Sequence, residues 1–339
     1  MSGGRVLMGH GGGGELAREL LDEVILPALG LTPDAAREDA ASIDLPPGAG
    51  RLALTTDSFV VRPLEFPGGD IGKLSVCGTV NDLAVSGARP LALTLALVIE
   101  EGFEIARLGR LLESAAAAAR AAGVRIVSGD TKVVEAGSAD GLFINTAGVG
   151  IVPGGVRVSA ASVRPGDECL VSGPLGRHGI AVLSAREGLR FETPVTSDCA
   201  SLSELCRSAL AAGGAGVHAM RDLTRGGAAA ALNEIATASG VAVEIDEAAI
   251  PEDQAVAGAC AMLGLDPLGV ANEGTLALFC GPAAAAPVLE AMRSTSEGRY
   301  AARVGRVLAG RRAQVLLRTR SGGRRILDMP HGEGLPRIC

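Results

Sequence analysis

The stretch from residue 72 to residue 99 reads GKLSVCGTVNDLAVSGARPLALTLALVI and changes from a helical to a strand pattern. In its first part, residues 72–87, the apolar side chains recur at helical spacing: Leu74, Cys77, Val80, Leu83 and Ala84. The apolar run at residues 91–99 is about half as long as the roughly 18–20 residues of a membrane span, so we interpret it as a buried strand. A helix followed by such a strand is typical of an α/β protein.

The alternation continues on both sides of this stretch. We expect helices at 15–26 and 104–122 and strands at 52–56, 124–128 and 143–152. After a turn at Arg164–Asp167 and a strand at 169–172, helices are expected near 177–187, 200–212, 226–238, 252–263 and 283–296. Further strands are expected near 242–245, 275–280, 301–307 and 313–318. The sequence thus predicts two halves that are both mixed α and β, with domains at 1–155 and 165–330 and a mobile tail at 331–339.

Composition excludes several classes of protein. The 339 residues carry a net charge of −7, and 47% are hydrophobic but only 2% aromatic, so the cores are expected to consist of Ala, Val, Leu and Ile. The acidic balance argues against binding to nucleic acid or to anionic membranes. Residues 1–14 contain no apolar signal-peptide core, so a cytoplasmic location is expected.

Acidic residues lie beside predicted elements in the first half of the chain. Asp57 follows the predicted strand at 52–56, Asp82 interrupts an apolar helix next to Asn81, and Asp130 follows the strand at 124–128. Carboxylates of this kind can converge on Mg²⁺ that also binds substrate phosphates. The alternative is that each aspartate only caps a helix or closes a turn.

The basic residues are unevenly divided. Of 31 basic residues only Lys73 and Lys132 are lysine. Since an ammonium can approach a single phosphate oxygen where a planar guanidinium cannot, Lys132 beside Asp130 is a candidate catalytic residue. Lys73 has a surface role near a helix start as its plain alternative. The segment before the tail is rich in arginine, which is typical of a solvated face and, less often, of a surface that docks a partner. The arginines are at positions 303, 306, 311, 312, 318, 320, 324 and 325.

Two segments are suited to bind an anion. The glycine run of residues 10–14 precedes a predicted helix, although no P-loop lysine follows it. Residues 221–227, RDLTRGG, lead into an Ala-rich helix for which Thr224 is the expected N-cap. The alternative for residues 10–14 is a flexible terminus, and the alternative for residues 221–227 is simple helix capping.

The chain ends with a thiol on its last residue. Six of the seven cysteines lack metal-ligand spacing and are expected to be buried small hydrophobes, but Cys339 follows Gly332, Gly334 and Pro336 at the end of a segment that can move. Such a thiol can be loaded at one site and carried to another. Glu273, before the strand at 275–280, is a candidate general base if it lies near Cys339, with a turn carboxylate as the alternative.

These motifs together resemble the HypE family of hydrogenase maturation factors, carbamoyl dehydratases of the aminoimidazole ribonucleotide synthetase (PurM-like) superfamily. The resemblance extends over nearly the whole chain and is carried by the following segments: 10–14, 55–59, 80–83, 128–132, 143–146, 222–227, 271–274 and 335–339. The terminal Pro-Arg-Ile-Cys distinguishes this family from other ATP-using members of the superfamily.

The resemblance implies a PurM-like fold of two domains, an N-terminal one that binds ATP and dimerises and a C-terminal α+β one. It further implies that a HypF-like carbamoyltransferase loads Cys339, that ATP drives dehydration to a thiocyanate, and that a HypC–HypD-like complex receives the cyanide. By similarity, Asp57, Asp82 and Asp222 would hold Mg²⁺ and phosphates. The nucleotide site would be completed by Asp130, Thr131, Lys132, Arg225, Gly13 and Gly14.

Two other functions fit parts of the sequence. A nucleotide-gated scaffold would use the arginine-rich segment to dock maturation partners without turnover. A kinase or synthetase acting on a free small molecule would share the superfamily motifs but would have no use for the tail.

Overall fold

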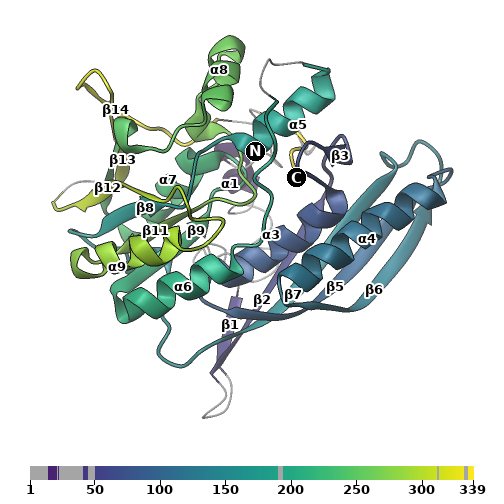
Figure 1. Cartoon of the computed structure of the whole chain (residues 1–339), viewed down its shortest axis with the longest axis horizontal. Helices are drawn as coiled ribbons and strands as arrows, with labels where there is room; N and C mark the ends of the chain where they lie inside the picture. Colours follow the sequence, from purple (N-terminus) through teal and green to yellow (C-terminus); the bar gives the residue numbers. More distant parts are fainter. Residues whose placement is uncertain are drawn as a thin grey trace.

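Figure 1 shows the computed structural model, which describes residues 14–20, 22, 41–44, 50–189, 194–310, 313–331 and 335–339. Two separate sheets organise these residues, one in each half of the chain. Helix α1, Glu15–Leu20, is the described part of the helix expected at 15–26. The chain then reaches the first sheet.

The first sheet has the strand order β1-β2-β7-β5-β6. Only β5 and β6 run parallel, and the other neighbours are antiparallel. The strands are β1 Ala41–Asp44, β2 Arg51–Phe59, β5 Arg89–Glu100, β6 Arg125–Val134 and β7 Leu142–Val152. Helices α3, Ile71–Val85, and α4, Ile105–Ala121, lie across one face of this sheet (Figure 1). A small hairpin, β3 Glu65–Phe66 and β4 Gly69–Asp70, leads into α3.

The other face of the first sheet is left uncovered by the residues that the structure describes. Side chains of β5 and β7 alternate between buried and more exposed positions, as expected for a sheet covered on one side. The residues at 91–99 therefore form a half-buried strand, and the expectation of a fully buried one was wrong. Apolar side chains lie exposed here, among them Leu54, Val98 and Val127.

Helix α3 is the central element of the fold. The side chain of Asp70 accepts a hydrogen bond of 2.9 Å from the backbone N–H of Lys73 and so caps the helix start. Nearly every side chain of α3 is buried, because the helix packs on the first sheet and its last turn also joins the core of the second half. Asn81 and Asp82 are thus held in a rigid, enclosed position.

The second sheet has the order β14-β13-β10-β12-β8-β11-β9, with β10 and β13 parallel and the other neighbours antiparallel. Its strands are β8 Glu168–Val171, β9 Val217–Asp222, β10 Ala242–Asp246, β11 Leu276–Cys280, β12 Ala302–Leu308, β13 Gln314–Arg318 and β14 Arg324–Ile326. Alternate residues of β8 and β11 belong to different cores, one with α7 and one with α6 and α9. The helices of this half are α5 Arg177–Glu187, α6 Ser203–Gly213, α7 Gly227–Ser239, α8 Gln254–Leu263 and α9 Pro282–Arg293.

The end of the chain returns to the first half. Ile338 is only 4% exposed, and Leu335 and Cys339 pack against the same core as α3 and α4. In Figure 1 the C-terminus accordingly lies beside α5 and β3. None of the helices in the described part of the chain is both long and apolar enough to cross a bilayer.

Candidate functional site

A cleft of about 350 Å³ lies where β2 and α3 of the first half meet β9 and α7 of the second. Its lining combines carboxylates, arginines and one thiol. The lining residues are Thr56, Asp57, Ser58, Phe59, Gly78, Asp82, Arg221, Asp222, Thr224, Arg225, Ala230, Ala231, Glu234, Glu273 and Cys339.

The three aspartates predicted to act together do line this one cleft. Asp57 projects from β2 and accepts a hydrogen bond of 2.9 Å from Thr79 Oγ1, while Asp82 on α3 accepts one of 2.7 Å from Thr55 Oγ1. Asp222 is the last residue of β9 and is 6% exposed. Asp57 lies within β2 rather than after its end, because the strand continues past the apolar residues to Phe59.

The buried surroundings of these carboxylates disfavour their ionised form. Burial, together with the charge of Asp57, raises the pKa of Asp222 to about 6, against partial compensation by Arg221. Burial likewise raises the pKa of Asp57. A cation brought into the cleft would relieve this cost.

The carboxylates fit Mg²⁺ that arrives with a nucleotide. Within the described ranges, no three acidic, His or Cys side chains form a group that could hold a metal ion by itself. Mg²⁺ usually takes one or two carboxylates and completes its shell with phosphate and water oxygens. The cleft therefore suits a magnesium–phosphate complex better than a bare ion.

Replacing Asp222 with asparagine is expected to stabilise the ligand-free protein. Since the folded-state pKa is raised from 3.8 to about 6, the native state binds more protons than the unfolded chain in this window. Stability then falls as pH rises through the window and stays reduced above it. We expect the melting temperature at about pH 7.5 to rise by about 2–4 °C, equivalent to ~1 kcal/mol, with a smaller gain near pH 4. Thermal unfolding at both pH values checks this, and a lower melting temperature than wild type at the higher pH would contradict it.

The start of α7 faces the cleft. Gly226 and Gly227 have φ of 73° and 60°, which only glycine adopts at little cost, and Gly226 is the N-cap without any side-chain hydrogen bond. Thr224 is therefore not the cap, and that expectation was wrong, because the two glycines place Thr224 a turn before the helix. Arg225 precedes them and lowers the pKa of Asp57 by its charge. Helix dipole and guanidinium together favour an anion here.

Glu273 is the most unusual acid of the cleft. It is 3% exposed, and its Oε1 is buried without a hydrogen-bond partner within the described residues. Burial, Asp222 and Asp198 raise its pKa well above the usual range, so these surroundings favour the protonated form. An unpartnered buried oxygen that faces a cleft is available to a substrate.

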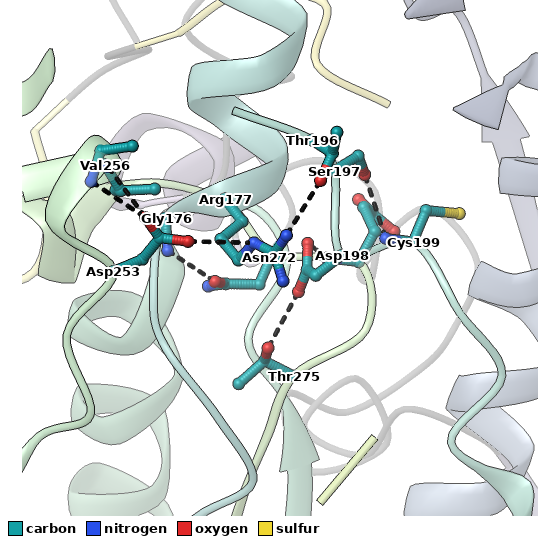
Figure 2. Close-up of polar contacts among 12 residues, drawn as sticks. Gly176, Arg177, Thr196, Ser197, Asp198, Cys199, Asp253, Val256, Asn272 and Thr275 are labelled. Carbon is teal, nitrogen blue, oxygen red and sulfur yellow. Dashed lines mark hydrogen bonds and ion pairs between the residues drawn. The ribbon is translucent and has the colours of Figure 1, made fainter. Parts of the chain in front are cut away.

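The loop carrying Glu273 is clamped by Asp198, a residue that no sequence motif singled out. Its carboxylate accepts hydrogen bonds from Glu273 N at 3.1 Å, Gly274 N at 3.0 Å and Thr275 Oγ1 at 2.9 Å, and Figure 2 shows the last of these. A Cβ on Gly274 would come within 1.9 Å of the Asp198 carbonyl oxygen, so no other residue fits. Asn81 adds a contact of 3.3 Å to the Glu273 carbonyl.

Cys339 lies in the same cleft as Glu273 and the aspartates. Burial and the surrounding carboxylates raise the pKa of its thiol to about 12, with Glu273 the largest charge effect. At neutral pH the docked sulfur is thus a thiol. The expectation that the terminal cysteine can enter the interior agrees with this position.

Other predicted site residues lie elsewhere. Lys132 and Asp130 are exposed on β6 and pair with each other at 2.6 Å, and neither lines the cleft. Thr131 lies between them in β6, which continues to Val134, so Asp130 is inside the strand and not at its end. Gly14 is buried beside α1 and does not line the cleft, and Gly13 lies outside the described residues. Lys73 donates to the Gly68 carbonyl at 3.0 Å, a structural contact.

The arginine-rich segment is largely neutralised by neighbouring acids. The described arginines at 303, 306, 318, 320, 324 and 325 each form an ion pair. Residues 311 and 312 lie outside the described residues. The docking surface required by the scaffold hypothesis is therefore not a free basic patch.

Comparison with known proteins places the chain in a family. Models described as AIR synthase related protein, N-terminal and C-terminal domain, match residues 37–152 and 164–318. Carbamoyl dehydratase HypE from Rhodobacter capsulatus is 52% identical over 338 residues, 99% of this chain and 98% of that protein. The chain belongs to the HypE family. Its relative from Escherichia coli, also a carbamoyl dehydratase HypE, is 45% identical over 337 residues, with 98% and 99% covered. The resemblance inferred from the motifs is confirmed.

Solved structures of HypE proteins share the fold. A chain of a HypE–HypF complex aligns with a TM-score of 0.86 at 46% identity, covering 92% of this chain and 99% of that one. HypE in complex with ATP aligns with a TM-score of 0.82 at 43% identity, covering 99% and 100%. Thiamine monophosphate kinase from Aquifex aeolicus, at 19% identity and a TM-score of 0.64, shares the fold alone. The expected PurM-like fold of two domains is confirmed.

Proposed function

We propose that this chain is an ATP-dependent carbamoyl dehydratase that converts an S-carbamoyl group on its own Cys339 into a thiocyanate, the source of cyanide for the iron of a NiFe hydrogenase. The observation that carries the proposal is that Cys339, Glu273 and the three aspartates line one cleft. The HypE relatives named carbamoyl dehydratase and the HypE structure with ATP support it. In this proposal residues 1–155 form the ATP-binding and dimerisation domain, residues 165–330 the second domain and residues 331–339 the tail.

The reaction transfers one oxygen from the carbamoyl group to phosphate. The carbamoyl oxygen attacks the γ-phosphorus, the bond from that phosphorus to the ADP oxygen breaks, and one N–H proton leaves, which gives S–C(=NH)–O–phosphate. The C–O bond then breaks with phosphate as the leaving group and the remaining N–H proton is removed, leaving S–C≡N. The sum is loss of one water at the expense of ATP.

Residues of the cleft divide these tasks. Glu273 accepts the N–H protons through its unpartnered Oε1, a general-base role. Asp57, Asp82 and Asp222 would hold Mg²⁺, which when bound neutralises charge on the transferring phosphoryl group. Burial is the main reason that the pKa of Glu273 is raised, and the charge of Asp222 adds to it, so Mg²⁺ at the aspartates would lower this pKa and favour the ionised base. Arg225 and the first turn of α7 bind the phosphates.

Loading of the thiol takes place with the tail outside the cleft. A thiol whose pKa is about 12 is a poor nucleophile, and the tail is released to a HypF-like carbamoyltransferase for this step. The solved HypE–HypF complex supports that partner. The product cyanide passes to a HypC–HypD-like iron scaffold. The described cysteines are free thiols, which suits the reducing cytoplasm.

The open face of the first sheet is the proposed homodimer contact. An apolar groove crosses it, lined by Leu54, Thr55, Thr56, Ala92, Leu93, Thr94, Val127, Ala147, Gly148 and Val149. Thr56 lines both the groove and the cleft. Pairing of two copies here would bring β6, with Asp130, Thr131 and Lys132, toward the nucleotide of the partner copy.

Single-turnover phosphate release tests the proposed function against a scaffold. With S-carbamoylated protein and ATP, we expect one phosphate released per carbamoyl group, and no excess release with unmodified protein. Stopped-flow detection with a phosphate sensor measures both. Binding of ATP without any release from the carbamoylated protein would contradict the dehydratase and favour the scaffold.

A further inference from the structure

The docked tail is held by its main chain as well as by side chains, since Ile338 is buried and Arg337 Nε donates to Val60 O at 3.0 Å. Its last four carbonyl oxygens all accept hydrogen bonds from the body of the protein. Two come from the segment after β2: Val60 N donates to Cys339 O at 3.1 Å and Arg62 N to Arg337 O at 3.2 Å. The others come from His178 and Arg186, which lie eight residues apart on helix α5, about two turns along its axis.

Arg186 grips two consecutive peptide groups. Its Nη1 donates to Pro336 O at 2.5 Å and its Nη2 to Arg337 O at 2.6 Å, while its Nε donates to Arg62 O at 2.8 Å. One rigid guanidinium therefore joins the tail to the segment after β2. Charge-assisted bonds of this kind are stronger than neutral ones.

His178 binds the next carbonyl from a fully buried position. Its Nε2 lies 2.9 Å from Ile338 O, and its Nδ1 lies 2.8 Å from Ser197 Oγ. A carbonyl can only accept, so Nε2 carries the proton and Ser197 donates to Nδ1. His178 is 0% exposed while the tail is docked, and withdrawal of the tail removes the acceptor of its N–H. Burial also lowers the pKa of His178, in keeping with this neutral form.

The partner of His178 belongs to the segment that positions Glu273. Ser197 Oγ also accepts from Cys199 N at 3.0 Å, as Figure 2 shows, and Asp198 between them clamps the Glu273 loop. Ser197 N donates to Pro67 O at 2.8 Å, which ties the same segment to the first half of the protein. The contacts that hold the tail and those that position Glu273 thus both involve the three consecutive residues 197–199.

We propose that His178 and Arg186 form a latch on α5 that keeps the tail docked through its main-chain carbonyls, and that this latch sets Cys339 against Glu273. Only the reason for docking the tail rests on the proposed function. The latch itself does not depend on catalysis. His178 and Arg186 bind carbonyl oxygens of the tail and not its sulfur.

Alkylation of Cys339 by iodoacetamide, followed by peptide mass spectrometry in the full chain without nucleotide, tests the latch. Arg186→Met keeps the apolar stem of the side chain and removes all its donors, and His178→Phe keeps the ring shape and removes both hydrogen bonds. Each is expected to raise the alkylation rate about tenfold, equivalent to about 1.4 kcal/mol of docking free energy. His178→Gln, whose amide nitrogen can donate in place of Nε2, is expected to restore most of the protection.

Arg207→Met is the matched control, because Arg207 is an exposed arginine of α6 paired with Glu204. It should alkylate at the wild-type rate. Unchanged rates in both latch variants, with wild-type melting temperatures, would overturn the proposal. So would a wild-type rate equal to that of a free peptide of residues 335–339. Neither result depends on dehydration, so failure of the latch and failure of the proposed function are distinguishable.

Discussion

Replacement of Cys339 by alanine is expected to abolish thiocyanate formation completely while ATP binding is retained. The sulfur is the atom to which the carbamoyl group is attached, and no other described cysteine lines the cleft. Removing it also removes the only covalent link between cargo and enzyme. Cyanide trapping after incubation with carbamoyl donor and ATP measures the product, and equilibrium binding of a non-hydrolysable ATP analogue measures the retained step.

Cys260→Ala is the matched control, since this thiol lies on α8 in another core, shared with residues of α5, and does not line the cleft. It should form thiocyanate at the wild-type level. Thiocyanate formed by the Cys339→Ala protein would mean that another group carries the carbamoyl and would refute the account. Loss of ATP binding in the same variant would contradict the separation of nucleotide site and tail.

Glu273→Gln is expected to slow dehydration by about 10²–10⁴-fold, the usual contribution of a general base. Glutamine cannot accept the N–H proton. Because burial raises the pKa of Glu273 and so favours the neutral acid, the near-isosteric amide is expected to leave folding intact. Carbamoylation of Cys339 proceeds outside the cleft and should be unaffected, so the S-carbamoyl form should accumulate. Rapid-quench mass spectrometry measures its decay after ATP is added.

Glu204→Gln, at an exposed position on α6, provides the control for loss of a carboxylate. It should decay at the wild-type rate. A Glu273→Gln protein that dehydrates within about twofold of wild type would assign the base elsewhere, given that a positioned base contributes far more than that.

Much of the fold could be predicted because it follows from local periodicity. The helix expected at 177–187 has the bounds of α5, and α3 carries Asp82 inside a buried helix as its apolar spacing indicated. Cys339 could be singled out because its place on the last residue is visible in the sequence without knowledge of any contact. The convergence of Asp57, Asp82 and Asp222 was predicted from family motifs and agrees with the cleft.

What could not be predicted depends on contacts distant in sequence. Strand β9 was missed because its sequence VHAMRD places polar residues in a strand that is buried on both faces by neighbouring helices. The apolar runs stop before β2 and β6 end, so Asp57 and Asp130 were expected after strands that in fact continue. Nothing local marks Asp198, His178 or Arg186, whose contacts with the Glu273 loop or with the tail span 75 to 160 residues.

Mass spectrometry of the unaltered chain, both intact and after digestion to peptides, tests the central claim most directly. After addition of carbamoyl donor the protein is expected to gain the mass of one carbamoyl group on the peptide ending in Cys339. After ATP is added, the same peptide should lose the mass of one water while one phosphate is released. A carbamoylated tail whose mass stays constant as ATP is hydrolysed would contradict the claim that Cys339 and the cleft perform the dehydration.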